Sequence, residues 1–277
     1  MELPSREEIL AALRREVAEL ENFENSTVGP AGPGPLAGAP ADAAEKSSPD
    51  FPTDSPCQAS SAALPGEDKK KRWDCLRDRV LGCPVCNSHV SAGKRVVFGV
   101  GNLNADIFFC GEAPGAEEEI AGEPFVGPSG KLLNEFIGAM GLKRSQVYIS
   151  NILNWRPEAP KGQNNRPPTR KEMDFCLPYL RAQVEIVQPK VIVTLGNSAI
   201  HGFLDPSDNR PMYDLRREWH SWSGVPLRAT YHPSHLLRNR PAPSQPDKLK
   251  RQVWEDLLLV MERVQLPISP EQRDYFR

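Results

Sequence analysis

Three parts of this 277-residue chain carry side chains that suit one kind of chemistry. Each part follows an apolar run: GEAPG at 111–115 continues to PFVG at 124–127, SN occupies 150–151, and HPS occupies 232–234. Short apolar runs are typical of buried parallel strands, and ligands bind at the carboxyl ends of such strands, so we expect the three loops to meet. The pocket would hold an aromatic ring, a carboxamide and an imidazole, a set that suits a planar nucleobase.

The elements that must position these loops alternate along the chain. Four apolar segments are predicted as strands: 107–110, 147–149, 191–195 and 227–231. Helical patterns begin near Ser129, after Thr169, at Asn197 as a cap, and at 247. Pro178 should kink or split the second of these helices. The alternation predicts an α/β protein, a three-layer α/β/α sandwich with a central four-stranded parallel sheet.

The motifs GEAPG…PFVG, SNI…RP and HPSHLLRN, in this order, resemble the uracil-DNA glycosylase superfamily. The resemblance runs from about Cys83 to Val264 and is strongest to family 4, whose thermophilic members carry an iron–sulfur cluster. It implies an enzyme that flips deoxyuridine out of DNA, hydrolyses the N-glycosidic bond and leaves an abasic site for base-excision repair.

The resemblance also implies a role for each pocket residue. Phe125 would stack on the extruded base, and Asn151 would read the edge that distinguishes uracil from cytosine. His232 would donate a hydrogen bond toward uracil O2, where negative charge develops. Ser234 would hold a phosphate, and Leu236 would fill the gap in the base stack. Core packing for Phe125 and Leu236, and turn capping for Asn151, are the ordinary alternatives.

The best-known branch of the superfamily has an aspartate where this chain has Ala113, at the edge of the substrate site. Alanine can neither orient water nor stabilise a positive sugar, so another carboxylate must do so. We expect Glu118 first, with Glu112 as the second candidate and Asn165 as a partner that fixes a carboxylate or water. At least one glutamate of the run 117–119 is expected to be a solvated surface charge.

Four positions bear on a metal. The resemblance implies Cys83, Cys86 and Cys176 as ligands of a structural [4Fe–4S] cluster, but Trp155 stands at the remaining ligand position. The isolated CxxC favours a cluster with an exchangeable fourth ligand. A metal-free core in which Trp155 fills the volume is the alternative, and a zinc site is less favoured. Substitute ligands would be Cys75, Cys110 or His89, although Cys110 should be buried in a strand.

Composition divides the chain. Residues 1–24 are predicted as an amphipathic helix, 25–70 as a Pro/Ala/Gly/Ser-rich linker, and 71–277 as the glycosylase domain. Residues 1–68 hold 4 Lys and Arg against 13 Asp and Glu, whereas residues 69–277 hold 30 against 23. A basic domain suits phosphate binding.

The expected partner is uracil-containing DNA, with a protein partner for the N-terminal helix as a further expectation. We expect a monomer. No membrane span is expected, because no apolar run is long enough to cross a bilayer, and the acidic N-terminus is unlike a signal peptide, so a cytoplasmic location is expected.

Two other functions remain open. A low-turnover or covalent uracil-DNA binding protein is disfavoured because the insert 158–168 lacks histidine. A nucleotide hydrolase would need a Walker-type loop, which the sequence lacks.

Overall fold

A parallel sheet forms the centre of the fold, in a computed structural model that describes residues 68–158, 166–242 and 245–276. These residues belong to one unit of the chain, Phe51–Arg277. Its central strands run parallel in the order β3-β2-β4-β6: β2 (Ile107–Gly111), β3 (Tyr148–Asn151), β4 (Val191–Leu195) and β6 (Val225–Thr230). The four predicted strands are therefore confirmed.

The sheet of the described residues has six strands rather than the predicted four. The two additional strands, β1 (Val100–Gly101) and β5 (Trp219–Trp222), pair antiparallel at opposite edges. β1 is only two residues long, and β5 alternates between exposed and half-buried positions. Neither strand has the continuous apolar run on which the prediction depended.

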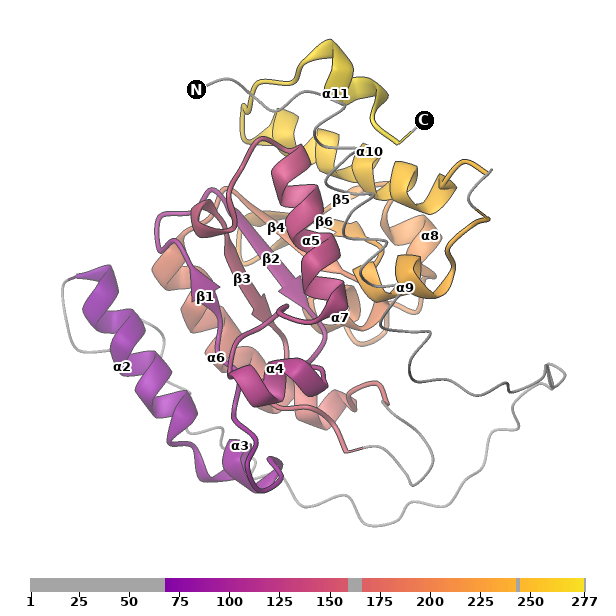
Figure 1. Cartoon of the computed structure of the whole chain (residues 1–277). Helices are drawn as coiled ribbons and strands as arrows, with labels where there is room; N and C mark the ends of the chain where they lie inside the picture. Colours follow the sequence, from indigo (N-terminus) through magenta and orange to yellow (C-terminus); the bar gives the residue numbers. More distant parts are fainter. Residues whose placement is uncertain (1–67, 159–165, 243–244, 277) are drawn as a thin grey trace, which may run out of the picture. The chain divides into compact units, whose positions relative to one another are not determined.

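Successive residues of a strand point to opposite faces, and each face of this sheet has its own core. Phe108 packs in the core on one face, with residues of helices α2, α6 and α7. Phe109 packs in the core on the other face, with residues of α5, α9 and α10. Figure 1 shows α5 and α10 in front of the sheet and α6 behind it. The predicted three-layer α/β/α arrangement is confirmed.

The helices of the described residues have the following bounds: α2 Lys69–Leu81, α3 Pro84–Ser88, α4 Ala116–Ala121, α5 Pro128–Ala139, α6 Arg170–Val187, α7 Asn197–Phe203, α8 Met212–Leu215, α9 Pro233–Arg238, α10 Lys248–Arg263 and α11 Pro270–Asp274. A 3-10 helix, η2, spans Arg144–Gln146. None of these helices is long and apolar enough to span a membrane.

Local sequence explains how two of these helices begin. The Thr169 side chain accepts a hydrogen bond from the Glu172 amide, and the Glu172 carboxylate accepts one from the Thr169 amide, so the predicted capping box is confirmed. α6 continues through Pro178, so the predicted split does not occur. The cap of α7 is Gly196 rather than Asn197, because Asn197 is already the first helical residue.

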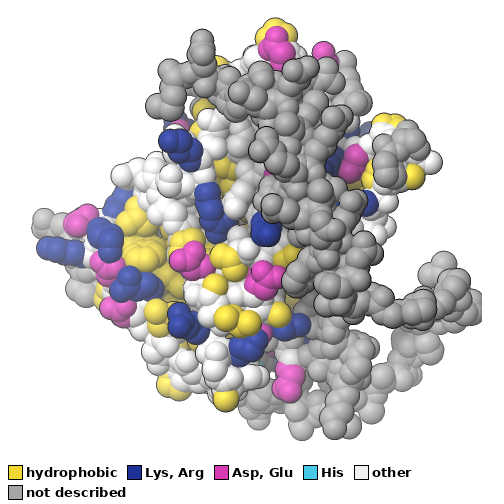
Figure 2. Space-filling model, in the orientation of Figure 1, with side chains coloured by type: hydrophobic (Ala, Val, Ile, Leu, Met, Phe, Trp, Pro, Cys, Tyr) yellow, Lys and Arg dark blue, Asp and Glu magenta, His cyan; other side chains and the backbone are white. Residues whose placement is uncertain are grey.

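Helix α2 begins at Lys69 after an Asp68 cap, within the last two residues of the predicted linker 25–70. Its exposed side carries interleaved charges: Lys70 and Arg77 both pair with Asp74. Figure 2 shows basic and acidic side chains close together at the left, where α2 lies in Figure 1. The predicted N-terminal helix and most of the predicted linker lie outside the described residues.

A buried ion-pair network joins β6 to α10. The Asp256 carboxylate accepts hydrogen bonds from Arg216, Arg228 and Thr230, at distances of 2.8 to 3.0 Å. An ion pair buried without such partners would be destabilising. Because Thr230 ends β6, the network also fixes the point from which the HPS loop leaves the sheet.

Candidate functional site

One cavity lies where the loops after β2, β3 and β6 meet, at the carboxyl ends of these strands. Its volume is about 660 Å³. Each of the three predicted loops contributes to its wall, through Glu112, Ala113, Glu118, Phe125, Asn151, His232 and Ser234. The structure thus brings together most of the site residues that the sequence singled out.

Phe125 and Asn151 approach each other across a glycine. Both side chains are 5% exposed. A Cβ atom on Gly111 would lie only 2.4 Å from Asn151 Oδ1 and 2.5 Å from Phe125 Cζ. Phe125 itself has a φ of +54°, a left-handed backbone conformation that residues other than glycine seldom adopt. Gly111 therefore makes room for the aromatic ring and the carboxamide to share one wall.

The Asn151 carboxamide carries an unused acceptor. Its Oδ1 atom is buried and has no hydrogen-bond partner among the described residues. A buried polar atom without a partner costs about 1 to 3 kcal/mol, so a ligand that donates to Oδ1 would recover this free energy. Asn151 thus presents an unsatisfied hydrogen-bond acceptor at the cavity wall.

His232 is held in one tautomer by its own loop. The Ser234 amide donates to His232 Nδ1 at 3.1 Å, so Nδ1 is the acceptor and Nε2 carries the proton of the neutral ring. The Ser234 hydroxyl lies 2.8 Å from Nδ1 and accepts from Arg238 at 3.2 Å. Burial, with a smaller contribution from Arg238, lowers the pKa of His232 to about 4. The imidazole is therefore a neutral donor through Nε2 near pH 7, with the Phe125 ring 5.6 Å away between centroids.

Glu118 holds two loops together. One carboxylate oxygen accepts from the Gly115 amide at 3.1 Å, and the other accepts from the Val126 and Gly127 amides, both at 2.9 Å. These bonds tie the GEAPG loop to the PFVG loop. The sequence predicted Glu118 as the water-activating carboxylate, but the geometry commits both of its oxygens to backbone amides. The other glutamates of the run differ: Glu117 is exposed and lines the cavity, and Glu119 pairs with Lys94 and Arg156.

Glu112 is the remaining carboxylate candidate in the cavity wall. Its side chain hydrogen-bonds to Ser198 and is partly buried. Burial raises the pKa of Glu112, while the Ser198 hydrogen bond and the nearby Arg238 charge oppose that rise. A carboxylate with a raised pKa is well suited to accept a proton near neutral pH.

One predicted site residue of the described ranges does not line the cavity. Leu236 is 2% exposed and packs in the core with α5 and α10, so the apolar wedge proposed for it does not match this conformation. Its neighbour Leu237 is half-buried. Asn165 lies outside the described residues.

The three predicted cysteine ligands are buried near one another. The Cys83 and Cys86 side chains are hydrogen-bonded, and Cys176 is close enough to both to interact electrostatically. Burial raises the pKa of Cys86 and of Cys176. Within residues 68–158, 166–242 and 245–276, no group of three or more His, Cys, Asp or Glu side chains is arranged to hold a metal ion. Cys110 lies fully buried in β2, as predicted.

Several cavity residues were not singled out from the sequence as site residues: Arg156, Ser198, Met212 and Tyr231. Ser198 follows β4, the fourth parallel strand, and the rule that located the other three loops would also have located it. Met212 had no comparable signal, because it begins α8, a helix of four residues that lies between α7 and β5 rather than after a parallel strand.

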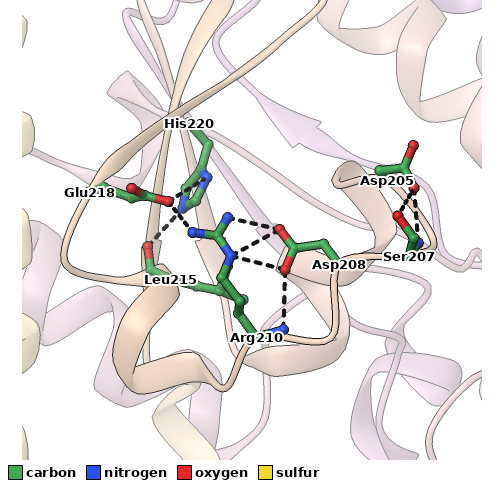
Figure 3. Close-up of polar contacts among 7 residues, drawn as sticks. All are labelled: Asp205, Ser207, Asp208, Arg210, Leu215, Glu218 and His220. Carbon is green, nitrogen blue, oxygen red and sulfur yellow. Dashed lines mark hydrogen bonds and ion pairs between the residues drawn. The ribbon is translucent and has the colours of Figure 1, made fainter.

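A charged network holds the chain on either side of α8, the helix that begins at Met212 (Figure 3). Arg210 donates to the Asp208 carboxylate at 2.8 to 3.2 Å and pairs with Glu218. The Arg210 hydrogen bonds lower the pKa of Asp208 to about 2, so the pair is charged throughout the physiological range. Figure 3 also places His220 beside Glu218. This network fixes the chain on either side of Met212.

Comparison with known proteins agrees with this geometry. Residues 98–258 match the description "Uracil DNA glycosylase superfamily". The chain is 39% identical over 190 residues to the type-4 uracil-DNA glycosylase of Thermotoga maritima, a match that covers 68% of this chain and 93% of that protein. It is 39% identical over 174 residues to the type-4 enzyme of Archaeoglobus fulgidus, covering 59% and 82% of the two chains. A type-5 uracil-DNA glycosylase of Pyrobaculum aerophilum is 30% identical over 154 residues, covering 50% and 66%. From these matches and from the loops that meet at its cavity, the chain belongs to the uracil-DNA glycosylase superfamily.

Proposed function

We propose that this protein is a uracil-DNA glycosylase, which hydrolyses the N-glycosidic bond of deoxyuridine flipped out of DNA and leaves an abasic site for base-excision repair. The observation that carries this proposal is the buried, unpaired Oδ1 of Asn151, which shares a cavity with Phe125 and a neutral His232. The type-4 names of its relatives support the same reaction.

Asn151 selects the base. Its Oδ1 accepts from uracil N3–H while its Nδ2 donates to uracil O4, and Phe125 stacks on the ring. Cytosine has an acceptor at N3 and a donor at N4, so both hydrogen bonds would be lost. Each unpaired buried group would cost about 1 to 3 kcal/mol, which makes the site reject cytosine.

His232 stabilises the leaving group. As the bond between C1′ and N1 breaks, its electron pair stays on the uracil ring and negative charge develops at O2. The Nε2–H donor of His232 is neutral and fixed in advance by Ser234, so it can stabilise this charge without transferring its proton.

Glu112 serves the sugar and the attacking water. Its carboxylate stabilises the positive charge that develops at C1′, and it accepts the proton that water loses as the water oxygen bonds to C1′. Glu118 acts as a positioning residue, since its carboxylate joins the GEAPG loop to the two amides that directly follow Phe125. A role for Asn165 beside Glu112 stays a prediction.

The DNA backbone is held at the mouth of the cavity. Ser234 and Arg238, which both line the cavity, bind the phosphate of the flipped nucleotide. We assign the filling of the base stack to Leu237 in place of the buried Leu236.

Further expectations from the sequence stay predictions. They are a monomeric state, a cytoplasmic location and a protein partner for the N-terminal segment. The pocket chemistry proposed above depends on none of them.

The reaction can be tested with single-stranded and duplex oligonucleotides that carry one U, T or C. After incubation, alkali cleaves abasic sites, and a parallel sample without alkali is run on a denaturing protein gel. Cleavage at U alone is expected. Intact DNA with a shifted protein band would identify a covalent uracil-DNA binding protein instead, and intact DNA without a shift would contradict both functions.

A further inference from the structure

Trp155 stands at the position where the family resemblance places a cluster ligand, and it is a fully buried core residue. Its ring stacks on His89, with centroids 4.7 Å apart and planes 12° from parallel. Phe175 of α6 packs at 6.1 Å on a tilted plane. Aromatic contacts of this kind contribute about 0.5 to 1.5 kcal/mol each beyond the buried area. The indole therefore joins α3 and α6, the elements around the three cysteines, by packing.

The sulfur atoms beside Trp155 already have protein partners. Cys83 and Cys86 are hydrogen-bonded to each other, and the Asn154 carboxamide donates to Cys176 Sγ at 3.8 Å. The Asn154 carbonyl oxygen in turn accepts from the Val97 amide at 2.8 Å. Of the four ligand positions that the family resemblance implies, three carry thiols, and the fourth carries the Trp155 indole, which has no thiolate to offer iron. These residues do not fit a cluster that needs four thiolates.

The same segment forms part of the cavity wall. Arg156 and Pro157, directly after Trp155, line the cavity. The indole packs in the core that includes residues of α2 and α6. Its packing therefore fixes the backbone from which Arg156 and Pro157 reach the cavity. A cluster ligand at this position would perform the same anchoring through a metal bond.

We propose that aromatic packing replaces a metal cluster as the support of this wall: the stacked rings of Trp155 and His89 hold together the elements that carry Cys83, Cys86 and Cys176, and the folded protein holds no [4Fe–4S] cluster. This inference is independent of the proposed glycosylase reaction, because it concerns how the cavity wall is supported.

The test compares iron and sulfide in the wild-type full chain and in Trp155→Cys. Both are purified without oxygen, then treated with ferrous iron and sulfide and desalted. Bound iron, bound sulfide and visible absorbance are measured. We expect the wild-type chain to retain no stoichiometric iron, and Trp155→Cys, with four thiolates, to gain about four iron atoms per chain.

Three controls make the result specific. Trp155→Phe keeps an aromatic ring and is expected to remain free of iron. Trp155→Cys combined with Cys176→Ser again lacks one thiolate and should lose the gained iron. An iron chelator is expected to leave the melting temperature of the wild-type chain unchanged.

Two results would overturn the inference. Wild-type protein that holds iron and sulfide near one cluster per chain, and loses them in Cys86→Ser, would show a cluster ligated by three thiolates. A folded Trp155→Cys protein that takes up no iron would show that residue 155 does not stand at a ligand position. The wild-type measurement decides whether the cluster is present even if Trp155→Cys fails to fold.

Discussion

At the residue scale, His232 gives the proposed reaction its sharpest test. The Ser234 amide sets the tautomer, so Nε2–H is oriented before DNA binds. Replacing His232 with alanine is expected to lower the single-turnover rate about 10²- to 10³-fold, the usual effect of losing a preorganised donor to a developing anion. The affinity for uracil-containing DNA should change far less. Equal losses in rate and affinity, measured by quenched reaction and by fluorescence anisotropy, would assign His232 to binding.

Asn151 should determine which base is accepted. In Asn151→Asp the carboxylate can accept from cytosine N4, so the rate at cytosine is expected to rise relative to the rate at uracil by about 10-fold or more, from the free energy of one mismatched buried group. Competition between U- and C-containing oligonucleotides measures the ratio. Unchanged selectivity would remove Asn151 as the reading residue. Asn154, which contacts Cys176 rather than the cavity, offers a matched control in Asn154→Asp.

Glu112 should set the acid limb of the pH profile. Burial raises the pKa of Glu112 above its usual 4.5, whereas the pKa of His232 is lowered to about 4. As the pH falls, Glu112 therefore gains its proton before His232 does, and the single-turnover rate should fall in that higher range. Glu112→Gln is expected to lower the rate about 10²-fold and to abolish this limb. If the single-turnover rate of Glu112→Gln still falls at low pH, the protonation of another group causes that fall.

At the element scale, the Glu118 carboxylate acts as a clasp between two loops. Glu118→Ala leaves three partly buried amides without an acceptor, and we expect the free energy of unfolding to fall by about 2 to 4 kcal/mol. Urea denaturation measures the loss. Glu117→Ala, one residue away on the exposed side, should be close to neutral. An unchanged free energy of unfolding in Glu118→Ala would show that the two loops hold their shape without the Glu118 hydrogen bonds.

The elements also show what a sequence can predict. The four parallel strands and the capping box at Thr169 were predictable, because apolar runs and cap pairs are local signals. The role of Glu118 was not, because its amide partners at 126 and 127 approach it only after the chain folds. Leu236 and Leu237 are equally apolar and contact the same core, and only the folded structure shows that Leu236 is buried and Leu237 half-buried.

At the scale of the whole molecule, charge should govern DNA binding. Lys and Arg exceed Asp and Glu by 30 to 23 in residues 69–277, and arginines line the cavity. The affinity for DNA is expected to fall as salt rises, and Arg238→Gln should reduce the slope by about one unit. Lys190, which precedes β4 and so lies at the opposite end of the strands, provides the control Lys190→Gln. Equal slopes in the two variants would mean that Arg238 makes no phosphate contact.

The two short antiparallel strands have a consequence for how the protein behaves in solution. An edge strand with many unpaired amides invites another chain to extend the sheet, which is how many proteins begin to form fibrils. Within the described residues, β1 offers only two residues at one edge. At the other edge, β5 keeps Trp219 beneath the guanidinium groups of Arg228 and Arg263. Both edge strands are short, which limits the number of backbone hydrogen bonds that another chain could add to the sheet.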